Sequence, residues 1–345
     1  MKRSSLHTVD VHIGGDVHQI IVSGVPEIPG DSPAEKREYL RRNDGLRCLL
    51  LDEPRGAHPS HFANLVVAPA HPHAEAGFVI MEYMGYPLFS GSNSMSVAIA
   101  LLEEGTVPLR DGKRPIVLES PGGLVEMTAN CKDGKVVSVS YKPDSTAYVA
   151  LKDQAIDVPG HGSVRFDLVW SGCFYCVIDG PSHGFEMTRG EEAAMGAFGF
   201  DFMRAASRYV KFDHVELGNQ GRSDFVLMVA PPEKRAGGVW ERIVSPVVFP
   251  RSVSRCPSGT GTTAAMAQMV EQGIMHNGDR LISRSCWGTR FEGHCYAVEP
   301  YADTTGCRVE VTGDGWIVAR KELVVDFDDP LTPGEGLQEI LKPCG

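Results

Sequence analysis

The chain has 345 residues, too many for one core of ordinary size and too few for three domains, so two domains of roughly 150–170 residues are expected. Hydrophobic residues make up 42% of the sequence and charged residues 22%, which predicts a packed globular protein and excludes a disordered one. The formal net charge of −11 disfavours a broad nucleic-acid surface. We expect no secretory signal, because no apolar run follows the two cations at the N-terminus. We expect no membrane span, because no apolar run approaches about 18 residues.

Nine cysteines are present, an odd number for a chain of this length. This count disfavours a disulfide framework and suits a reducing compartment, where thiols pack as small apolar groups or react. The sequence therefore predicts a cytoplasmic protein.

Strands are predicted where short runs of β-branched and aromatic residues lie between turn residues. These runs cover residues 18–24, 47–54, 62–69, 76–83, 115–120, 124–129, 135–141, 164–170, 173–179, 224–231, 246–250, 293–300, 307–313 and 315–327. Asp133-Gly134 between two of them predicts a hairpin.

Helices are predicted at residues 32–43, where Ser32 is a candidate cap, and at 189–210. Two further helices, at 94–105 and 262–273, are strongly apolar, about three turns long, and end at Gly. A strand-rich chain with one apolar helix in each half predicts an α+β fold whose β-layers wrap around a buried central helix.

The two apolar helices and the residues before them form an internal repeat. The first copy starts at Ser90 (SGSNSMSVAIALLEEG) and the second at Ser258 (SGTGTTAAMAQMVEQG), an offset of 258 − 90 = 168 residues. The serines, the glycines after them and a Glu-x-Gly motif at the end of each helix are shared. Each copy thus predicts exposed backbone N–H groups at a helix N-terminus, which suit a carboxylate or phosphate. The alternative is that Ser90 and Ser258 are ordinary N-caps.

Five motifs in order resemble the proline racemase superfamily. In chain order, the five motifs are Asp10-Val11-His12-Ile13-Gly14-Gly15-Asp16, Glu53-Pro54-Arg55-Gly56, Ser90-Gly91, Pro257-Ser258-Gly259-Thr260-Gly261-Thr262 and Gly288-Thr289-Arg290-Phe291-Glu292-Gly293. The resemblance implies two pseudo-symmetric domains of the diaminopimelate-epimerase type, with a cofactor-free and metal-free site between them. We expect the first domain over residues 1–160, with 321–345 as a candidate completion, and the second over 161–320.

The sequence departs from the family pattern at the reacting positions. In the racemases both opposed residues are cysteines, whereas here they are Ser90 and Ser258. Ser92 replaces a histidine and Ser254 replaces an aspartate. The stretch around Ser90 and Asn93 resembles a branch associated with hydroxyproline epimerisation and with dehydration of trans-3-hydroxy-L-proline. That branch has a cysteine at its second position, and the dedicated dehydratases have Cys and then Thr, so a Ser/Ser pair matches neither.

Two unassisted serines suit racemisation poorly, because serine is hardly ionised at neutral pH. Dehydration needs only one base at the α-proton. We therefore expect Ser90 as base and Ser258 as a hydroxyl donor near the leaving group. The substrate carboxylate is expected on groups of Gly91, Ser92, Asn93, Ser254, Gly259 and Thr260, where it also stabilises charge at Cα.

The predicted substrate is a proline-like imino acid, and neither nucleic acid nor a membrane is an expected partner. A homodimer is left open. The alternatives are a 4-hydroxyproline 2-epimerase or racemase-like isomerase, and a catalytically silent amino-acid-binding paralogue.

Other motifs have structural interpretations that we favour. Residues 259–264 match a dinucleotide fingerprint and 180–184 a nucleophile elbow, but neither has the required strand and helix around it. Cys173 and Cys176 form a C-x-x-C inside a strand pattern, with His71 and His73 as the conceivable partner pair for zinc.

Overall fold

The computed structural model describes residues 3–52, 61–143, 145–210, 212–216, 218, 225–248, 251–333 and 336–341. Contacts within the chain divide it into unit 1, Met1–Tyr141 with Asp314–Gly345, and unit 2, Lys142–Gly313. The expected first boundary is near residue 160. In the structure it falls after β7, so the long hairpin that follows belongs to unit 2. The second boundary falls inside one strand, β17.

Unit 1 is a closed ring of strands. Each strand pairs with the next along the chain, β7 pairs with β17, and β17 returns to pair with β1. The strands are β1 (Arg3–Ile13), β2 (Asp16–Ser23), β3 (His61–Val67), β4 (Ala76–Met81), β5 (Gly112–Ser120), β6 (Gly123–Lys132), β7 (Lys135–Tyr141) and β17 (Thr304–Asp326).

Unit 2 closes in the same way, with β16 pairing to β17 and β17 pairing to β8. Its strands are β8 (Ala147–Val158), β9 (Gly162–Trp170), β10 (Phe174–Asp179), β11 (Phe225–Val229), β13 (Val239–Val248), β15 (Arg280–Arg284), β16 (Arg290–Tyr301) and the first part of β17. The short strands β12 (Glu233–Lys234) and β14 (Ser252–Val253) pair with β13. Closure leaves each ring without a free edge.

The two units share one connectivity. In unit 1 the pairs β2–β3 and β4–β5 are parallel, and in unit 2 the pairs β10–β11 and β13–β15 are parallel. Helix α3 (Gly91–Glu103) connects β4 to β5, and α5 (Gly259–Glu271) connects β13 to β15. The helices have 13 residues each and keep the offset of 168. The predicted α+β fold of two pseudo-symmetric domains is confirmed.

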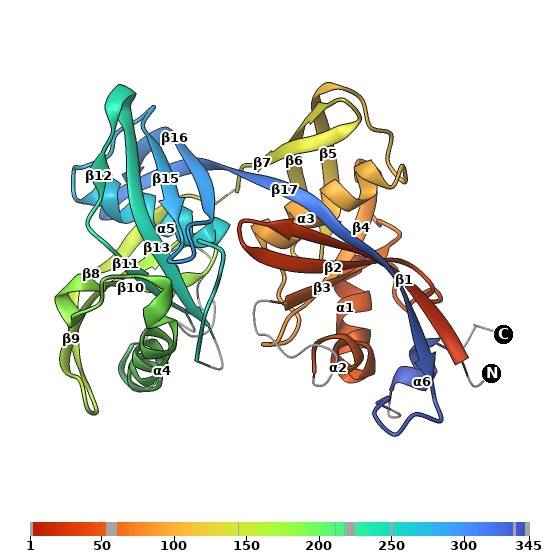
Figure 1. The fold of residues 1–345 in the computed structure, drawn as a ribbon. Coiled ribbons are helices and arrows are strands. Elements are labelled where there is room, and N and C mark those ends of the chain that lie inside the picture. Colours follow the sequence, from red (N-terminus) through yellow and green to blue (C-terminus); the bar gives the residue numbers. More distant parts are fainter. Residues whose placement is uncertain are drawn as a thin grey trace. The chain divides into compact units, whose positions relative to one another are not determined.

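Each ring encloses its connecting helix, as Figure 1 shows for α3 and α5. In α3 the residues from Asn93 to Leu102 are buried, and in α5 those from Gly261 to Val270 are buried. A helix that is apolar on every face is stable only when it is surrounded, and closed rings of strands provide that surrounding. This placement fixes where each helix begins, and therefore where Ser90 and Ser258 lie.

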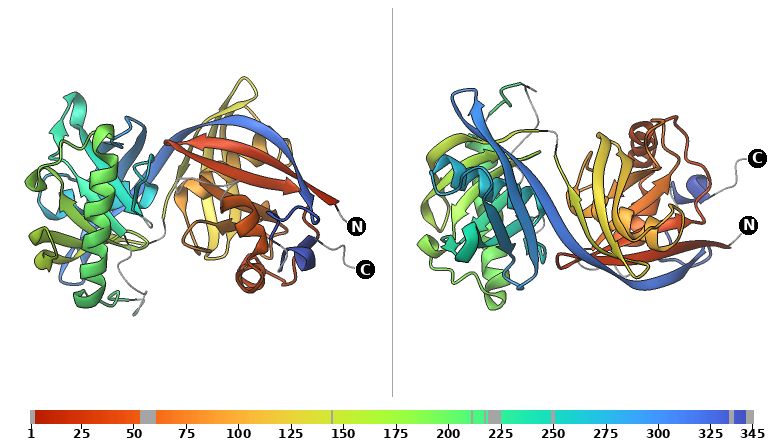
Figure 2. Two further views of the ribbon diagram at one scale, coloured as in Figure 1. Left: turned by 60° about the horizontal axis from the view of Figure 1, so that its bottom comes forward. Right: turned by 90° about the horizontal axis from the view of Figure 1, so that it is seen from above.

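Further helices cover the outside of each ring. In unit 1, α1 (Pro33–Arg42), α2 (Gly45–Leu51) and α6 (Leu337–Leu341) share an apolar cluster with β2, β3 and β4. In unit 2, α4 (Glu192–Tyr209) packs on β-strands through Met195, Phe198 and Phe202, and runs along one side of the unit in Figure 2. Short 3₁₀ turns occupy η1 (Pro181–His183), η2 (Arg189–Glu191) and η3 (Ala236–Gly238).

Two local predictions are confirmed in detail. The Ser32 side chain caps α1 by accepting a hydrogen bond from the Glu35 amide at 3.2 Å. Asp133 and Gly134 both have positive φ, 54° and 73°, as a type I′ turn between β6 and β7 requires. Each cysteine that the structure describes is a free thiol, as the odd count predicted.

The strand predicted at residues 47–54 is wrong. Residues 45–51 form α2, and residues 53 and 54 lie outside the described part of the chain. The run is leucine-rich rather than β-branched, and Arg47 pairs with Asp44 one turn earlier, which favours a helix. Strands β1, β8 and β15 and the short strands β12 and β14 went unpredicted, and the runs at 307–313 and 315–327 are one continuous strand, β17. Among the described residues, no helix is long and apolar enough to cross a membrane.

The central helix should dominate the stability of unit 1. Leu101 in α3 is 0% exposed, whereas Val318 on β17 is 55% exposed. We expect Leu101→Ala to lower the free energy of unfolding by about 2–5 kcal/mol, because it leaves a cavity inside a closed ring. The control Val318→Ala should change it by less than about 0.5 kcal/mol. Urea denaturation followed by circular dichroism measures both, and equal effects would contradict the assignment of the core.

Candidate active site

Ser90 and Ser258 each stand directly before the first residue of a central helix. The two carbonyls accept the first helical hydrogen bonds, from the amides of Ser94 and Thr262. Their side chains differ. Ser258 Oγ accepts a hydrogen bond from the Gly261 amide at 3.1 Å, as an N-cap does, whereas Ser90 makes no side-chain cap bond. The N-cap interpretation therefore describes Ser258 and fails for Ser90.

The Ser90 hydroxyl is held by Asn93, one turn into α3. Asn93 Nδ2 donates to Ser90 Oγ at 2.8 Å and also to Glu82 Oε1 at 2.8 Å. Ser92 Oγ lies 3.5 Å from Ser90 Oγ. Because the amide nitrogen is a donor, Ser90 Oγ is the acceptor in this bond, and its own proton is free to point elsewhere.

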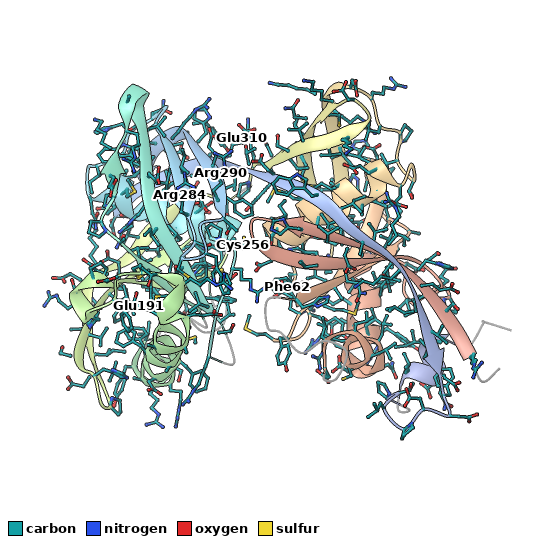
Figure 3. The ribbon with its side chains drawn as sticks, in the orientation of Figure 1. Phe62, Glu191, Cys256, Arg284, Arg290 and Glu310 are labelled. Atoms are coloured by element: carbon teal, nitrogen blue, oxygen red, sulfur yellow. The ribbon has the colours of Figure 1, made fainter. Side chains whose placement is uncertain are left out.

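The Asn93 side chain is saturated with hydrogen bonds. Its oxygen accepts from Asn64 Nδ2 on β3 at 2.7 Å, and it lies 3.0 Å from His18 Nδ1 on β2. Asn93, Asn64 and His18 are all 0% exposed. Burial lowers the pKa of His18 to about 3, against the hydrogen bond with Asn93, so the ring is neutral and Nδ1 carries the proton that it donates. The His18 ring stacks on Phe62, labelled in Figure 3, with centroids 5.0 Å apart.

Glu82 contributes the carboxylate of this network. It follows β4 directly and closes a tight turn, in which its amide and carbonyl both bond to Gly85. Burial raises the pKa of the Glu82 carboxyl to about 7, while the hydrogen bond from Asn93 opposes that shift. A group with that pKa can both accept and release a proton at neutral pH.

The Ser258 hydroxyl lies in a cluster of other hydroxyls. Tyr175 Oη is 3.3 Å from Ser258 Oγ and 2.9 Å from Thr260 Oγ1, and Ser258 Oγ is 3.0 Å from Thr260 Oγ1. Tyr175 is 3% exposed, and burial raises the pKa of its phenol well above the usual range. The phenol therefore stays protonated, and the cluster can donate protons but has no carboxylate among these partners.

Ser258 has a strained backbone, with φ 63° and ψ 139°. A residue other than glycine rarely adopts positive φ, and such strain persists only where the surroundings impose it. The preceding loop supplies these constraints. The Ser258 amide donates to Cys256 Sγ at 3.3 Å, and the Cys256 amide donates to Ser254 Oγ at 3.2 Å. Figure 3 labels Cys256 in this loop.

The predicted substrate-binding residues gather in two groups. Gly91, Ser92 and Asn93 form the first turn of α3, and Gly259 and Thr260 form the first turn of α5. N–H groups in a first turn lack partners within their helix. Ser254, which is 6% exposed, instead shapes the loop before Ser258. Binding of a carboxylate by these groups stays a prediction.

The other sequence motifs have structural roles in the described residues. Asp10 is buried and pairs with Lys321 on β17, and His12 stacks on Trp316. Thr289 Oγ1 donates to the Arg255 carbonyl at 2.5 Å, which ties the late motif to the loop before Ser258. The motif at residues 53–56 lies outside the described residues.

The remaining motifs do not form additional sites. Cys176 is buried within β10, as the strand interpretation predicted, and Ser182 lies on an exposed 3₁₀ turn. His71 and His73 are exposed neighbours in unit 1. Within the described ranges, no group of three or more metal-binding side chains gathers.

Sequence reasoning missed four of the side chains that surround the serines: His18, Asn64, Glu82 and Tyr175. One signal was available, because Glu82 is an acidic residue directly after a fully buried strand. His18, Asn64 and Tyr175 come from strands distant in sequence, and only the ring closure brings them to the helix ends.

The family model for proline racemase matches residues 8–335. The chain belongs to the proline racemase family. A protein of Marinobacter nauticus is 38% identical over 339 residues, covering 98% of this chain and 96% of its own, and one of Chromohalobacter salexigens is 36% identical over 338 residues, covering 98% and 93%. The family consists of enzymes that act on small amino acids, mostly as racemases and epimerases.

Solved structures of the family agree over the whole chain. A probable proline racemase from Agrobacterium radiobacter K84, with bound carbonate, is 30% identical with a TM-score of 0.83 and covers 98% of each chain. A hydroxyproline epimerase from Agrobacterium vitis, with bound trans-4-hydroxy-L-proline, is 28% identical with a TM-score of 0.82 and covers 99% of this chain and 97% of its own. A methylitaconate-Δ-isomerase, 12% identical with a TM-score of 0.54 and coverage of 94% and 97%, shares the fold alone.

Strain at Ser258 predicts that glycine is tolerated there by the fold. Ser258→Gly relieves about 1–3 kcal/mol of backbone strain. It loses only a few tenths of a kcal/mol from the helix cap, and the extra conformational entropy that glycine loses on folding costs about 0.5–1 kcal/mol. We expect the unfolding free energy to stay equal or rise. The control Ser32→Gly, at a cap with φ −139°, should lower it. Chemical denaturation compares the two, and a larger loss at Ser258 would contradict the strain.

Proposed function

We propose that the protein removes the α-proton of a proline derivative and dehydrates trans-3-hydroxy-L-proline to a pyrroline-2-carboxylate. Ser90 is the base and Ser258 a hydroxyl donor near the leaving group. The observation that carries this proposal is the difference between the partners of the two hydroxyls. Ser90 Oγ accepts a hydrogen bond from the buried Asn93 amide, which also donates to the Glu82 carboxylate. Ser258 Oγ instead lies among hydroxyl groups.

That difference suits a reaction with one base. In dehydration the Cα–H and C3–O bonds break, the leaving oxygen takes a proton, and one water is released. The proton removed from Cα balances the proton given to the leaving oxygen, so the reaction needs only one residue that acts as a base. The enamine product then tautomerises to the pyrroline. Hydroxyls around Ser258 can donate to the leaving oxygen without being ionised beforehand.

The substrate carboxylate would be bound by first-turn N–H groups of the central helices. Partial positive charge at a helix N-terminus favours an anion there, and the same field stabilises negative charge that develops next to the carboxylate at Cα. A structural neighbour of 30% identity holds bound carbonate, which is consistent with an anion site in this protein.

Epimerisation of 4-hydroxyproline is the second candidate. The structural neighbour with bound trans-4-hydroxy-L-proline favours it. Epimerisation requires a proton donor at the opposite face of Cα, which must regain its proton from solvent in each turnover. The Ser258 cluster has the hydroxyls for this donation, but a phenol with a raised pKa and two aliphatic hydroxyls restore it less readily than a thiol.

The decisive assay offers hydroxyprolines without any added cofactor. We expect trans-3-hydroxy-L-proline to yield pyrroline-2-carboxylate, and Ser90→Ala to lower kcat/KM by about 10³-fold or more, because the proton acceptor is removed. Product formation is followed by absorbance and mass spectrometry. Full activity in Ser90→Ala would contradict the role of Ser90. Exchange of the α-proton of trans-4-hydroxyproline for deuterium with inversion would favour epimerisation, and no turnover of any proline derivative would favour a silent binding protein.

Substitutions at Ser258 separate the two reactions. Ser258→Thr keeps the hydroxyl and should retain dehydration within about tenfold, whereas Ser258→Cys supplies a group with a pKa near 8.5 and should add epimerisation. Both products are resolved by chiral chromatography. Loss of dehydration in the threonine variant, with its fold intact by circular dichroism, would contradict a donor role for this hydroxyl.

A further inference from the structure

Serine is a weak base until another group takes its proton. When Ser90 Oγ accepts the α-proton of a substrate, the proton that the hydroxyl already carries must leave. The Ser92 hydroxyl, 3.5 Å away, is no better a base than Ser90 itself. The described side chains around Asn93 include one carboxylate, Glu82, and it shares the same amide nitrogen with Ser90.

We propose that Glu82 accepts the proton of the Ser90 hydroxyl when Ser90 takes the α-proton; this inference rests on the proposed role of Ser90 as base. Electron pairs and protons balance as follows. The Cα–H bond breaks and its proton bonds to Ser90 Oγ. The original Ser90 O–H bond breaks and its proton bonds to a Glu82 carboxylate oxygen. Glu82 becomes a neutral acid, and the negative charge passes to the substrate.

The geometry supports this transfer. Ser90 Oγ and Glu82 Oε1 each lie 2.8 Å from Asn93 Nδ2, so the two oxygens are at most 5.6 Å apart, twice that distance. One water molecule with ordinary hydrogen bonds of about 2.7–2.8 Å spans such a gap. An amide nitrogen carries two protons and no lone pair for relay, so Asn93 positions both oxygens and does not itself transfer the proton.

The surrounding network keeps Asn93 in that orientation. His18 and Asn64 both donate to its oxygen, which leaves its nitrogen facing Ser90 and Glu82. Burial of the Glu82 carboxyl disfavours its charge and places its pKa about 7, close to the value at which a general base is most effective near neutral pH. The described side-chain partners of Ser258 Oγ are hydroxyls, and no carboxylate is among them.

Other titratable groups lie on the elements around Glu82. Burial lowers the pKa of His18 on β2 to about 3, so its ring is neutral across pH 5–9, and its Nδ1–H donates a hydrogen bond to Asn93. Tyr86, in the segment after Glu82, donates to Asp44, and burial raises its pKa. The remaining described titratable groups on β2, β3, β4 and this segment are Asp16, His61 and Tyr83.

The test compares the wild type with Glu82→Gln, Ser90→Cys and the double variant, using exchange of the substrate α-proton in deuterated water across pH 5–9. In the wild type the rate should rise with pH through about 7, because the base must be ionised. Glu82→Gln should lower the rate by about 10²–10⁴-fold and remove that rise. Glu82→Asp should keep the rise with a reduced rate.

The cysteine background separates proton acceptance from a structural role. A thiol ionises without a partner base, so adding Glu82→Gln to Ser90→Cys should cost less than tenfold. Equal losses in the serine and cysteine backgrounds, or an unchanged pH dependence in Glu82→Gln, would overturn the proposal. Glu103→Gln is the matched control, because Glu103 lies at the far end of α3 and accepts only from the Val136 amide; its rate should stay within twofold.

Failure of the proposed function is distinguishable from failure of this inference. Infrared difference spectra of wild type against Glu82→Gln report the protonated carboxyl band of Glu82 without any substrate. When this band is followed across pH, a titration midpoint near pH 7 supports the inference even where no hydroxyproline is turned over. A midpoint near the ordinary glutamate value of about 4.3 would overturn it even where dehydration is observed.

Discussion

The fold depends on burying an apolar helix inside a closed ring of strands. Such a helix loses all its lateral contact with water, so the polar groups of its first turn must be satisfied by side chains from the ring. In α3 the polar group concerned is the buried side chain of Asn93, whose four hydrogen-bonding positions are all occupied by groups from β2, β3, the residue after β4 and the helix cap. A structural need to satisfy a helix end thus creates a rigid polar site beside the Ser90 hydroxyl.

Duplication supplies the same helix end twice, and the ring around each copy makes the two ends chemically different. Around Ser90 the partners are an amide and a carboxylate whose pKa is raised to about 7. Around Ser258 they are a buried phenol and a threonine hydroxyl, under a backbone held at positive φ. Pseudo-symmetry of the fold therefore coexists with asymmetry of proton chemistry. That asymmetry is what favours one base and one donor over two interchangeable acid–base groups.

Much of the fold could be predicted from sequence because its signals are local. Period, turn residues and caps located α1, α3, α4, α5 and most strands, and the repeat offset located the two helix ends that carry the serines. The failures are also physical. Residues 45–51 are apolar with neither a clear helical nor a clear strand period, so contacts with β3 and α6 add to the weak local preference of the leucines for a helix. Strands β1 and β8 interleave polar and charged residues, as strands with one partly exposed face do, and lack a continuous apolar run.

The site could be predicted only as far as the residues adjacent in sequence to the helices. Ser90, Asn93, Ser258 and Thr260 lie within one turn of a recognisable helix start. Glu82 precedes Ser90 by eight residues. It contacts Asn93 because β4 ends, and α3 begins, at the same end of the ring. Tyr175 reaches Ser258 from a strand 83 residues earlier. No spacing rule encodes such contacts, since they arise from the closure of the ring.

When a hydroxyl stands in the place of a thiol, proton abstraction depends more on the neighbouring groups, because a hydroxyl ionises far less readily than a thiol. A cysteine close to a helix N-terminus is made acidic enough by the helix itself, so its neighbours can be inert. A serine gains too little from the same field, and it needs a second group whose pKa lies near that of the medium. A carboxyl reaches that range only when it is buried without a cation, and in unit 1 the described partner of Glu82 is a neutral amide. Ser90 and the desolvated carboxyl of Glu82 are therefore expected to form one functional unit.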